Sequence, residues 1–581
     1  MQKNKTKLIV TISVISLLIL VIWSSGLLSK SQLDFYASVK RNITVFGQVY
    51  KQTANNYVEE VDPEKFMRAG INGMLDELDP YSTYLEKEDR DEYEIMNRGK
   101  YYGVGLRITK RNGWPTVIEQ PFPNSPSEKA GIREGDQIIE IDGESTKDWS
   151  LSKTASKLRG KKKGSTVVIK IKRVGVDEPM TFSLIRDEIT VSDIQYSGFV
   201  EPGIGLIKLN TFDRSAEKQM TNAIEDLLDQ GMESLILDLR SNPGGLLDVA
   251  VSVANNFLPK GELVVYTQGR NPENIKEYRT TKNPVFGSLP LVVLINEYSA
   301  SASEIVAGSI QDLDRGVVIG QQSFGKGLVQ TILPIDRTAN VETSLKLTTA
   351  KYYLPSGRLI QKMDVFKRGK NSVLWDFQDD ESGDDKETEN AEQETEKELF
   401  NTRNNRQVIG GGGITPDIKA SNEKTTRYVG ELIRQSMFFN FSLEYASGHP
   451  ELTDGFKLDD KILNDFFNFV EEKDFDYEPA GMDEFKDLEE IAKKEEFYDD
   501  MEASFGQIQE KFQAVKKREK EKSIDDIKYL LKRELIAKLK GNDAAYATSF
   551  ERDATLAKAA EVLKDKDEYN RILGVQTARS N

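Results

Sequence analysis

The sequence predicts a multidomain α/β protein, with a mainly-β domain inserted ahead of an α/β core and helical regions at both ends. Three observations predict this fold class. Short apolar runs separated by glycines precede residue 189, strand–turn–helix units follow in series, and the residues after about 425 are charged with helical apolar spacing. Strand–turn–helix units in series are typical of a mainly parallel sheet with right-handed crossovers.

The first 30 residues are predicted to be a membrane anchor or a signal segment. Three lysines precede an uncharged stretch from Leu8 to Leu28, and about 20 apolar residues are enough to cross a ~30 Å hydrocarbon core. We favour a retained anchor whose lysines stay in the cytoplasm, with a cleaved signal peptide as the alternative. In both cases the bulk of the chain lies outside the cytoplasm.

The next two regions differ in the period of their apolar residues. Residues 31–97 have helical spacing, which ends near the segment LDPYSTYL. Residues 98–188 carry short strands and glycine turns, with one helix expected near Leu151–Leu158. A change of period from helical to alternating marks the start of a separate mainly-β unit.

Residues 189–424 carry the expected α/β core. Its buried strands include Ile204–Leu209, Ser234–Leu239 and Leu289–Asn296. An acidic run within about 365–405 has almost no apolar residues and is predicted to be a solvated, disordered insertion. Residues 425–581 are predicted to be helical, with a helix starting at Ser523.

Composition excludes several kinds of chemistry. The chain of 581 residues has no cysteine and a single histidine, His449, so a thiol nucleophile, a cysteine-ligated metal, a disulfide and a multi-histidine metal site are ruled out. Its net charge of −16 argues against a nucleic-acid partner, which would favour a basic surface. His449 lies after the α/β core, and we expect it to be a surface or capping residue.

Two short segments carry candidate catalytic residues. Ser299, Ser301 and Ser303 alternate where a strand ends and a helix begins, a position that suits a nucleophile because the helix N-terminus stabilises negative charge. Position alone favours the simpler alternative, a helix N-cap. Lys326 then stands between two glycines in FGKG. It could act as general base if burial lowered its pKa from ~10.4.

A serine–lysine pair is a known alternative to the serine–histidine arrangement. With one remote histidine in the chain, a lysine is the economical base for a serine enzyme. The segment around Lys326 is not a phosphate-binding P-loop, because Gly327 stands where that motif needs Ser or Thr.

At this point the chain resembles a known family. YSASASEIVAGSIQD followed by FGKGLVQ resembles the active-site signature of the carboxyl-terminal processing (tail-specific) serine proteases. LDPYSTYL, LILDLRSNPGGLL and GGGITPD occur in the family's order, and YYGVGLRI through GDQIIEIDG resembles its PDZ domain. The resemblance covers roughly residues 40–420. It implies a crotonase/ClpP-like α/β protease core, a PDZ domain at 98–188, and no cofactor or metal.

The resemblance also implies roles for single residues. Ser301 would be the nucleophile, Lys326 the base and Gln330 the residue that orients the lysine. Ser299 and Ser303 would be local hydrogen-bonding residues, with Ser303 and Glu304 capping or bracing the helix. The remaining candidates are the oxyanion donors, which are the backbone N–H of Ala302 and that of Gly244 or Gly245, and a PDZ carboxylate-binding loop formed by Gly103, Val104, Gly105 and Leu106.

The function that the resemblance implies is a serine endopeptidase of the bacterial cell envelope. It would be anchored in the inner membrane with its bulk in the periplasm, or secreted there if the N-terminal segment is cleaved, and its partners would be proteins or peptides with free C-termini. The C-terminal helices would serve dimerisation, giving a homodimer, or confine the substrate. Two rivals are a non-catalytic PDZ adaptor, which predicts loss of Ser301 or Lys326, and an acyltransferase or thioester enzyme, which needs a coenzyme A surface that the sequence does not show.

Overall fold

The computed structural model describes residues 30–160, 162–335, 343–362, 398–449, 451–453 and 455–575. These fall into two compact units, Met1–Leu78 and Asp79–Asn581, which are described separately. The predicted membrane segment and most of the predicted acidic insertion lie outside the described residues. Within the described ranges, no helix combines the length and the apolar character needed to cross a membrane.

The smaller unit is helical, as its apolar spacing predicts. Helix α2 (Lys30–Asn56) is followed by α3 (Pro63–Asp76). Asp62 caps α3 by accepting hydrogen bonds from the first free backbone N–H groups. The rings of Tyr50 and Phe66 hold the two helices together, with their centroids 5.2 Å apart.

The inserted mainly-β domain is an antiparallel sheet in the order β3-β4-β5-β7-β8, with β6 paired to β5. The expected helix is α6 (Leu151–Leu158), and a single turn, α5 (Pro126–Lys129), precedes it. A two-stranded ladder of β2 (Lys100–Gly103) and β9 (Asp187–Thr190) joins the entering and leaving chain. The sheet strands are β3 (Ile108–Arg111), β4 (Trp114–Val117), β5 (Gln137–Ile141), β6 (Glu144–Ser145), β7 (Thr166–Lys172) and β8 (Met180–Ile185).

The α/β core is built on a six-stranded sheet in the order β10-β11-β12-β15-β16-β21. Strands β11 to β21 run parallel, and only β10 at the edge is antiparallel to its neighbour. The predicted mainly parallel sheet is therefore confirmed. Its strands are β10 (Ile194–Glu201), β11 (Ile204–Leu209), β12 (Ser234–Asp238), β15 (Leu291–Ile295), β16 (Val317–Gly320) and β21 (Ile418–Lys419).

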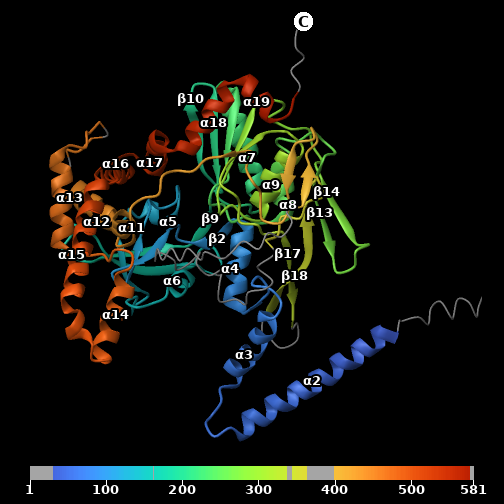
Figure 1. Ribbon diagram of the computed structural model, residues 1–581, viewed down its shortest axis with the longest axis horizontal. Coiled ribbons are helices and arrows are strands. Elements are labelled where there is room, and N and C mark those ends of the chain that lie inside the picture. The colour runs from blue at the N-terminus through green and yellow to red at the C-terminus, as the bar shows by residue number, and fades with distance from the viewer. Residues whose placement is uncertain are drawn as a thin grey trace, which may run out of the picture. The chain divides into compact units, whose positions relative to one another are not determined.

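Both faces of this sheet are covered by helices, as buried parallel strands require. Leu235 and Leu237 of β12 face a core formed with α7 (Ala216–Asp229), α8 (Leu247–Ala254) and α9 (Ala302–Asp312). We call this the near face. The alternate residues, such as Ile236, pack against the last helices of the chain, α18 and α19, on what we call the far face. Figure 1 shows these helices in red beside the green strands. Their bounds are Ala554–Lys564 and Lys566–Ile572.

A second, five-stranded antiparallel sheet lies beside the core and was not predicted. Its order is β1-β18-β13-β14, with β17 also paired to β18. Strand β1 comes from the segment LDPYSTYL, so this segment does more than end the helices, and α4 (Lys87–Arg98) follows it. The strands are β1 (Thr83–Leu85), β13 (Leu263–Gly269), β14 (Ile275–Arg279), β17 (Leu328–Pro334) and β18 (Ser344–Tyr353).

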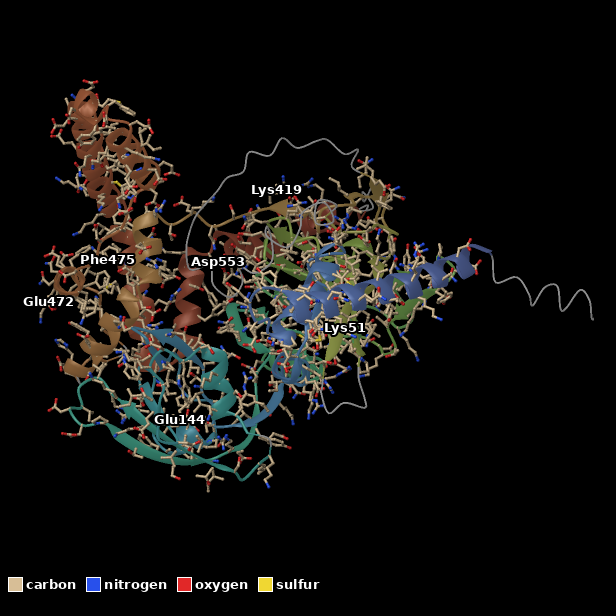
Figure 2. All side chains as sticks on the ribbon, turned by 90° about the horizontal axis from the view of Figure 1, so that it is seen from below. Lys51, Glu144, Lys419, Glu472, Phe475 and Asp553 are labelled. Atoms are coloured by element: carbon tan, nitrogen blue, oxygen red, sulfur yellow. The ribbon has the colours of Figure 1, made fainter. Side chains whose placement is uncertain are left out.

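The described end of the predicted acidic loop includes ordered backbone. Strand β19 (Leu399–Asn401) pairs with β20 (Gln407–Ile409), where apolar side chains return after the acidic run. The helical prediction for the C-terminal region is confirmed. Glu472 and Phe475, labelled in Figure 2, lie at the end of one of its helices. The helices before α18 are α11 (Arg427–Arg434), α12 (Met437–Gly448), α13 (Asp460–Glu472), α14 (Met482–Lys494), α15 (Tyr498–Lys522), α16 (Ile524–Lys540), and α17 (Asn542–Thr548).

Candidate active site

Ser301 occupies a sharp turn between β15 and α9. Its backbone angles are φ 55° and ψ −111°, in a region that non-glycine residues rarely adopt and that costs of order 1–3 kcal/mol. Helix α9 begins at the next residue, Ala302. The predicted arrangement of strand, turn and helix around the candidate nucleophile is therefore present.

The two neighbouring serines are committed to the scaffold. The Ser299 hydroxyl donates to the backbone oxygen of Leu239 at 2.8 Å, and the Ser303 hydroxyl donates to that of Asn242 at 2.9 Å. Both serines are fully buried. They fasten the turn to the segment that follows β12, which agrees with the prediction that they are local hydrogen-bonding residues.

The Glu304 carboxylate joins the serine turn to the lysine loop. Its Oε2 accepts hydrogen bonds from the backbone N–H of Ser301 at 2.7 Å and of Lys326 at 2.9 Å. Its Oε1 accepts from the Ser323 hydroxyl at 2.6 Å and the Gly325 N–H at 2.7 Å. Burial raises the pKa of Glu304 to about 7, although these hydrogen bonds oppose the rise. The sequence predicted a helix brace here but missed the link to the loop.

Lys326 is partly buried, in surroundings that shift it toward its neutral form. Burial, aided by the charge of Lys346, lowers the pKa of Lys326 to about 8, against the opposing charges of Glu304 and Asp79. Its Nζ lies 4.6 Å from the centroid of the Tyr81 ring. A lowered pKa is what the general-base hypothesis requires of a lysine.

The backbone carbonyl groups of Ser301 and Lys326 both hydrogen-bond the same hydroxyl group. Tyr352 Oη lies 3.2 Å from the Ser301 carbonyl oxygen and also hydrogen-bonds the Lys326 carbonyl oxygen. Among the described residues, no hydrogen bond joins the two side chains themselves. Catalytic hydrogen bonds are often long in a substrate-free enzyme and tighten when substrate binds, so the pair remains a candidate dyad.

Gln330 lies on β17, directly after the lysine loop. Its side-chain Nε2 donates to Thr348 Oγ1 at 3.2 Å, and that hydroxyl donates to Asp79 Oδ1 at 3.2 Å. This chain of hydrogen bonds fixes the Gln330 amide. The orienting role predicted for Gln330 stays a prediction.

The candidate oxyanion donors surround the serine turn. A Cβ atom on Gly244, whose φ is 103°, would lie 2.8 Å from Ser301 Cβ and 2.9 Å from the Ala302 nitrogen. The Gly244 N–H already donates to Asn242 Oδ1 at 2.9 Å. The N–H groups of Gly245 and Ala302, in contrast, donate to no other described residue. Of the three predicted donors, these two are free to bind an oxyanion.

The predicted carboxylate-binding loop, Gly103–Leu106, leads into the edge strand β3. Gly105 has φ 80°, and a Cβ there would lie 2.3 Å from Ser125 Cβ. The N–H groups of residues 104–106 donate to no other described residue, and α6 packs against β3. Free amides beside an open strand edge suit a peptide C-terminus added as an extra strand.

His449 lies far along the chain in the helical bundle, at the end of α12. Its Nδ1 lies 2.9 Å from the Tyr445 carbonyl oxygen, and its ring stacks on that of Tyr445 with centroids 4.0 Å apart. These are local contacts of a capping residue. The described residues also hold no cluster of three or more acids or histidines suited to a metal ion.

Comparison with known families matches most of the chain in separate pieces. The model described as "Peptidase family S41" covers the core with both candidate catalytic segments, at residues 203–366. The others are "PDZ domain" at 117–173, "Activating protease CtpB N-terminal domain" at 26–89, and "Probable PDZ-protease, C-terminal helical domain" at 428–563.

Several known proteins are similar over more than half of the chain. The carboxy-terminal-processing protease of Bartonella bacilliformis is 36% identical over 350 residues, which are 60% of this chain and 78% of that protein. The carboxy-terminal processing protease CtpA of Bacillus subtilis is 34% identical over 320 residues, which are 55% of this chain and 66% of that protein. Among solved structures, the photosystem II D1 C-terminal processing protease is 28% identical, covering 55% of this chain and 90% of its own with a TM-score of 0.32.

Proposed function

Because the chain belongs to the carboxy-terminal processing protease family and is a serine-type peptidase, we propose that Ser301 and Lys326 are its catalytic dyad. The observation that carries this proposal is the Glu304 carboxylate, which binds the backbone N–H of both residues. A single buried group thus holds the turn of a strained serine next to the loop of a partly buried lysine with a lowered pKa.

In this mechanism the neutral Lys326 amine takes the proton of the Ser301 hydroxyl as that oxygen attacks the scissile carbonyl. The free N–H groups of Gly245 and Ala302 hydrogen-bond the oxyanion of the tetrahedral intermediate. Lys326 then gives its proton to the leaving amine, and the acyl-enzyme forms. A water molecule hydrolyses the ester in a second round, with Lys326 again as base.

We further propose that the PDZ loop selects substrates by their free C-termini. The carboxylate would bind the N–H groups of residues 104–106, and the chain before it would pair with the edge of β3. Cleavage of a peptide with a free apolar C-terminus should therefore be faster than cleavage of the same peptide amidated at that end. Equal rates would remove the selecting role from this loop.

The experiment that tests the dyad compares the wild type with Ser301→Ala, Lys326→Ala and Lys326→Arg on an unfolded protein substrate. All three variants should lose proteolysis while keeping the wild-type melting temperature. The arginine variant fails because a guanidinium stays protonated. A PDZ adaptor would bind tails without cleaving them even in the wild type, and an acyltransferase would consume a thioester instead. Full activity in any of the three variants would refute the dyad.

We also propose that residues 8–28 anchor the protein in the inner membrane, with the bulk in the periplasm. The support is the uncharged stretch that follows three lysines. Protease added to cells with a permeabilised outer membrane should digest a tag placed at the C-terminus, and carbonate washing should leave the protein in the membrane pellet. Light scattering of the purified protein tests the expected homodimer.

A further inference from the structure

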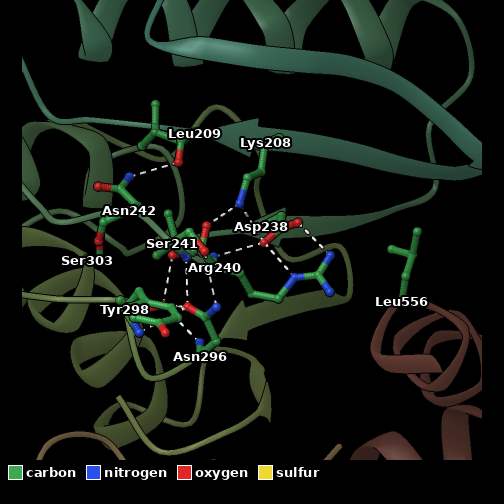
Figure 3. Close-up of polar contacts among 12 residues, drawn as sticks. Lys208, Leu209, Asp238, Arg240, Ser241, Asn242, Asn296, Tyr298, Ser303 and Leu556 are labelled. Carbon is green, nitrogen blue, oxygen red and sulfur yellow. Dashed lines mark hydrogen bonds and ion pairs between the residues drawn. The ribbon is translucent and has the colours of Figure 1, made fainter. Parts of the chain in front are cut away.

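A buried network of four charged side chains lies where the central sheet ends on its far face. Asp238, the last residue of β12, is fully buried and accepts hydrogen bonds from Arg240 Nε at 3.0 Å and Arg240 Nη2 at 2.8 Å. Lys208 Nζ lies 3.3 Å from the same carboxylate. Figure 3 shows Asp238 between the two cations, with the helix of Leu556 alongside. Although burial alone would raise the pKa of Asp238, the two cations hold it below its usual range.

The fourth charge comes from the C-terminal region. Asp553, labelled in Figure 2, binds Arg240 in bidentate fashion, at 2.9 Å from Nη1 and 2.7 Å from Nη2. The same carboxylate caps α18 by accepting from the Leu556 N–H at 3.0 Å. Tyr546, also from this region, donates its hydroxyl to Asp238 Oδ2 at 3.1 Å. The two cations and two carboxylates balance, so each charge is paired inside the protein.

Arg240 begins the short segment that ends at the proposed oxyanion donor Gly245. Other groups also fasten the segment. The Lys208 ammonium hydrogen-bonds the Arg240 carbonyl oxygen, Ser241 N–H donates to Asn296 Oδ1 at 2.7 Å, and Asn242 Nδ2 donates to the Leu209 oxygen at 2.8 Å. Arg240 is its only charged residue. The Arg240 side chain is thus positioned by Asp238 and Asp553, while its backbone N–H is held by Asp238 and its carbonyl oxygen by Lys208.

We propose that Asp553 is a positioning residue for the peptidase reaction, which holds Arg240 and through it the oxyanion-binding backbone of Gly245. The proposal rests on the function proposed above for Ser301 and Gly245. Without Asp553, the network keeps two cations and one carboxylate in a setting where the Arg240 side chain is 15% exposed. An unpaired buried charge is costly, so the guanidinium shifts toward water and draws the backbone of the segment with it.

The test compares Asp553→Asn with the wild-type full-length protein, because asparagine keeps the helix cap but loses the charge. Three quantities are measured: kcat and KM on a quenched fluorescent peptide, the inhibition constant of a peptide boronate, and the melting temperature. A boronate forms a tetrahedral adduct with a serine and so reports on the oxyanion site. Removing one oxyanion donor typically costs ~100- to 1,000-fold in kcat, and a displaced donor should cost about 10- to 100-fold.

The expected result is a fall in kcat and an equal fall in boronate affinity, at unchanged KM. Glu551→Gln is the matched control. Glu551 lies two residues before Asp553 and forms an exposed ion pair with Lys532, so its replacement should change neither kcat nor boronate affinity. Asp553→Glu should recover part of the loss. If Asp553→Asn does not fold, Tyr546→Phe decides by the same measurements, with a smaller loss expected.

Wild-type kcat and boronate affinity in Asp553→Asn, or in Tyr546→Phe if that variant has to decide, would overturn the proposal. So would a loss in which kcat falls and boronate affinity stays constant, since the oxyanion site would then be intact. Failure of the proposed dyad is a separate result: it would show as full proteolysis by Ser301→Ala, whatever Asp553→Asn does.

Discussion

The near and far faces of the central sheet are built from the same strands but from different parts of the chain. The near-face helices α7, α8 and α9 alternate with those strands along the sequence, whereas the far-face helices α18 and α19 come at the end of the chain. The candidate nucleophile begins a near-face helix. The far face contributes charge at the ends of the strands through Asp553 and Arg240. The candidate nucleophile thus belongs to a helix that is close in sequence to the strands, whereas the charged groups that surround the strand ends come partly from the end of the chain.

The two faces should therefore respond differently to substitution. Substitutions on the near side should affect catalysis directly, and those in the far-face core should affect stability first. A large catalytic effect of an apolar far-face substitution would break the comparison.

Gly244→Ala should have the largest effect, a loss of about 100-fold or more in kcat. The added methyl group would meet Ser301 Cβ at 2.8 Å and the Ala300 oxygen at 2.7 Å, so the nucleophile turn has to move. Gly231→Ala is the matched control: its φ of 92° is equally strained for alanine, but nothing lies within 4 Å of the added atom. The control should lose about 1–2 kcal/mol of stability and keep its kcat. Equal rates in the two variants would show that contact with Ser301 is irrelevant.

Glu304→Gln should lower kcat by about 10- to 100-fold and reduce the free energy of unfolding by ~1–3 kcal/mol. In the wild type both carboxylate oxygens accept hydrogen bonds from N–H or O–H groups of the serine turn and the lysine loop. In the glutamine variant an NH₂ group, which can only donate, replaces one of these oxygens. Denaturant unfolding and steady-state kinetics on the same preparation measure both effects. A variant with lower stability but unchanged kcat would limit Glu304 to a scaffold role.

The pH profile of kcat/KM should rise about tenfold per pH unit below a pKa of about 8 and level off above it, since the reaction needs neutral Lys326. The same lysine should make the free energy of unfolding depend on pH, but in a higher range. Between pH 8 and 10.5 the unfolded chain binds more protons than the native state, so the free energy of unfolding contributed by Lys326 rises with pH. Lys326→Met should lose this part of the rise. A kcat/KM profile flat from pH 6 to 9 would require another base.

Leu556→Ala, in the far-face core, should change kcat of the folded protein by less than about threefold. Leu556 is 2% exposed and packs against Ile236 and its neighbours on the sheet, so its truncation should cost ~2–5 kcal/mol of stability. Ile224→Ala, at a buried position of the near-face core, is the matched variant and should cost a similar amount. Kinetics measured below the melting temperature of each variant separate the effect on kcat from the effect on stability.

The sequence predicted the parts of the fold whose signals are local. Strands such as Leu291–Ile295 are continuous apolar runs, and the serine turn was predicted from a strand followed by a helical pattern. The second sheet was missed because β1 and β18 pair residues as distant as Thr83 and Lys346, and half-buried strands such as β18 lack a strong apolar alternation.

The candidate site divides in the same way. The motifs point to Ser301, Lys326 and the glycines, whose identity is set by nearby backbone geometry. Which glycine N–H is free depends on the side chain of Asn242, and the tie between Glu304 and the lysine loop depends on how two segments fold together. Asp553 has no motif at all, because its role arises only when the last helices cover the sheet.

His449→Ala should have the smallest effect, with kcat and KM unchanged. The histidine contacts Tyr445 through its ring and its Nδ1 in the helical bundle, so its loss should cost at most about 1 kcal/mol of stability. It is the single histidine of the chain, and a serine–histidine mechanism would therefore need it. Tyr445→Leu, which removes the stacking partner and keeps the histidine, controls for packing. A large loss of kcat in His449→Ala with full activity in Tyr445→Leu would replace the lysine base by a histidine and move the catalytic centre away from the near face.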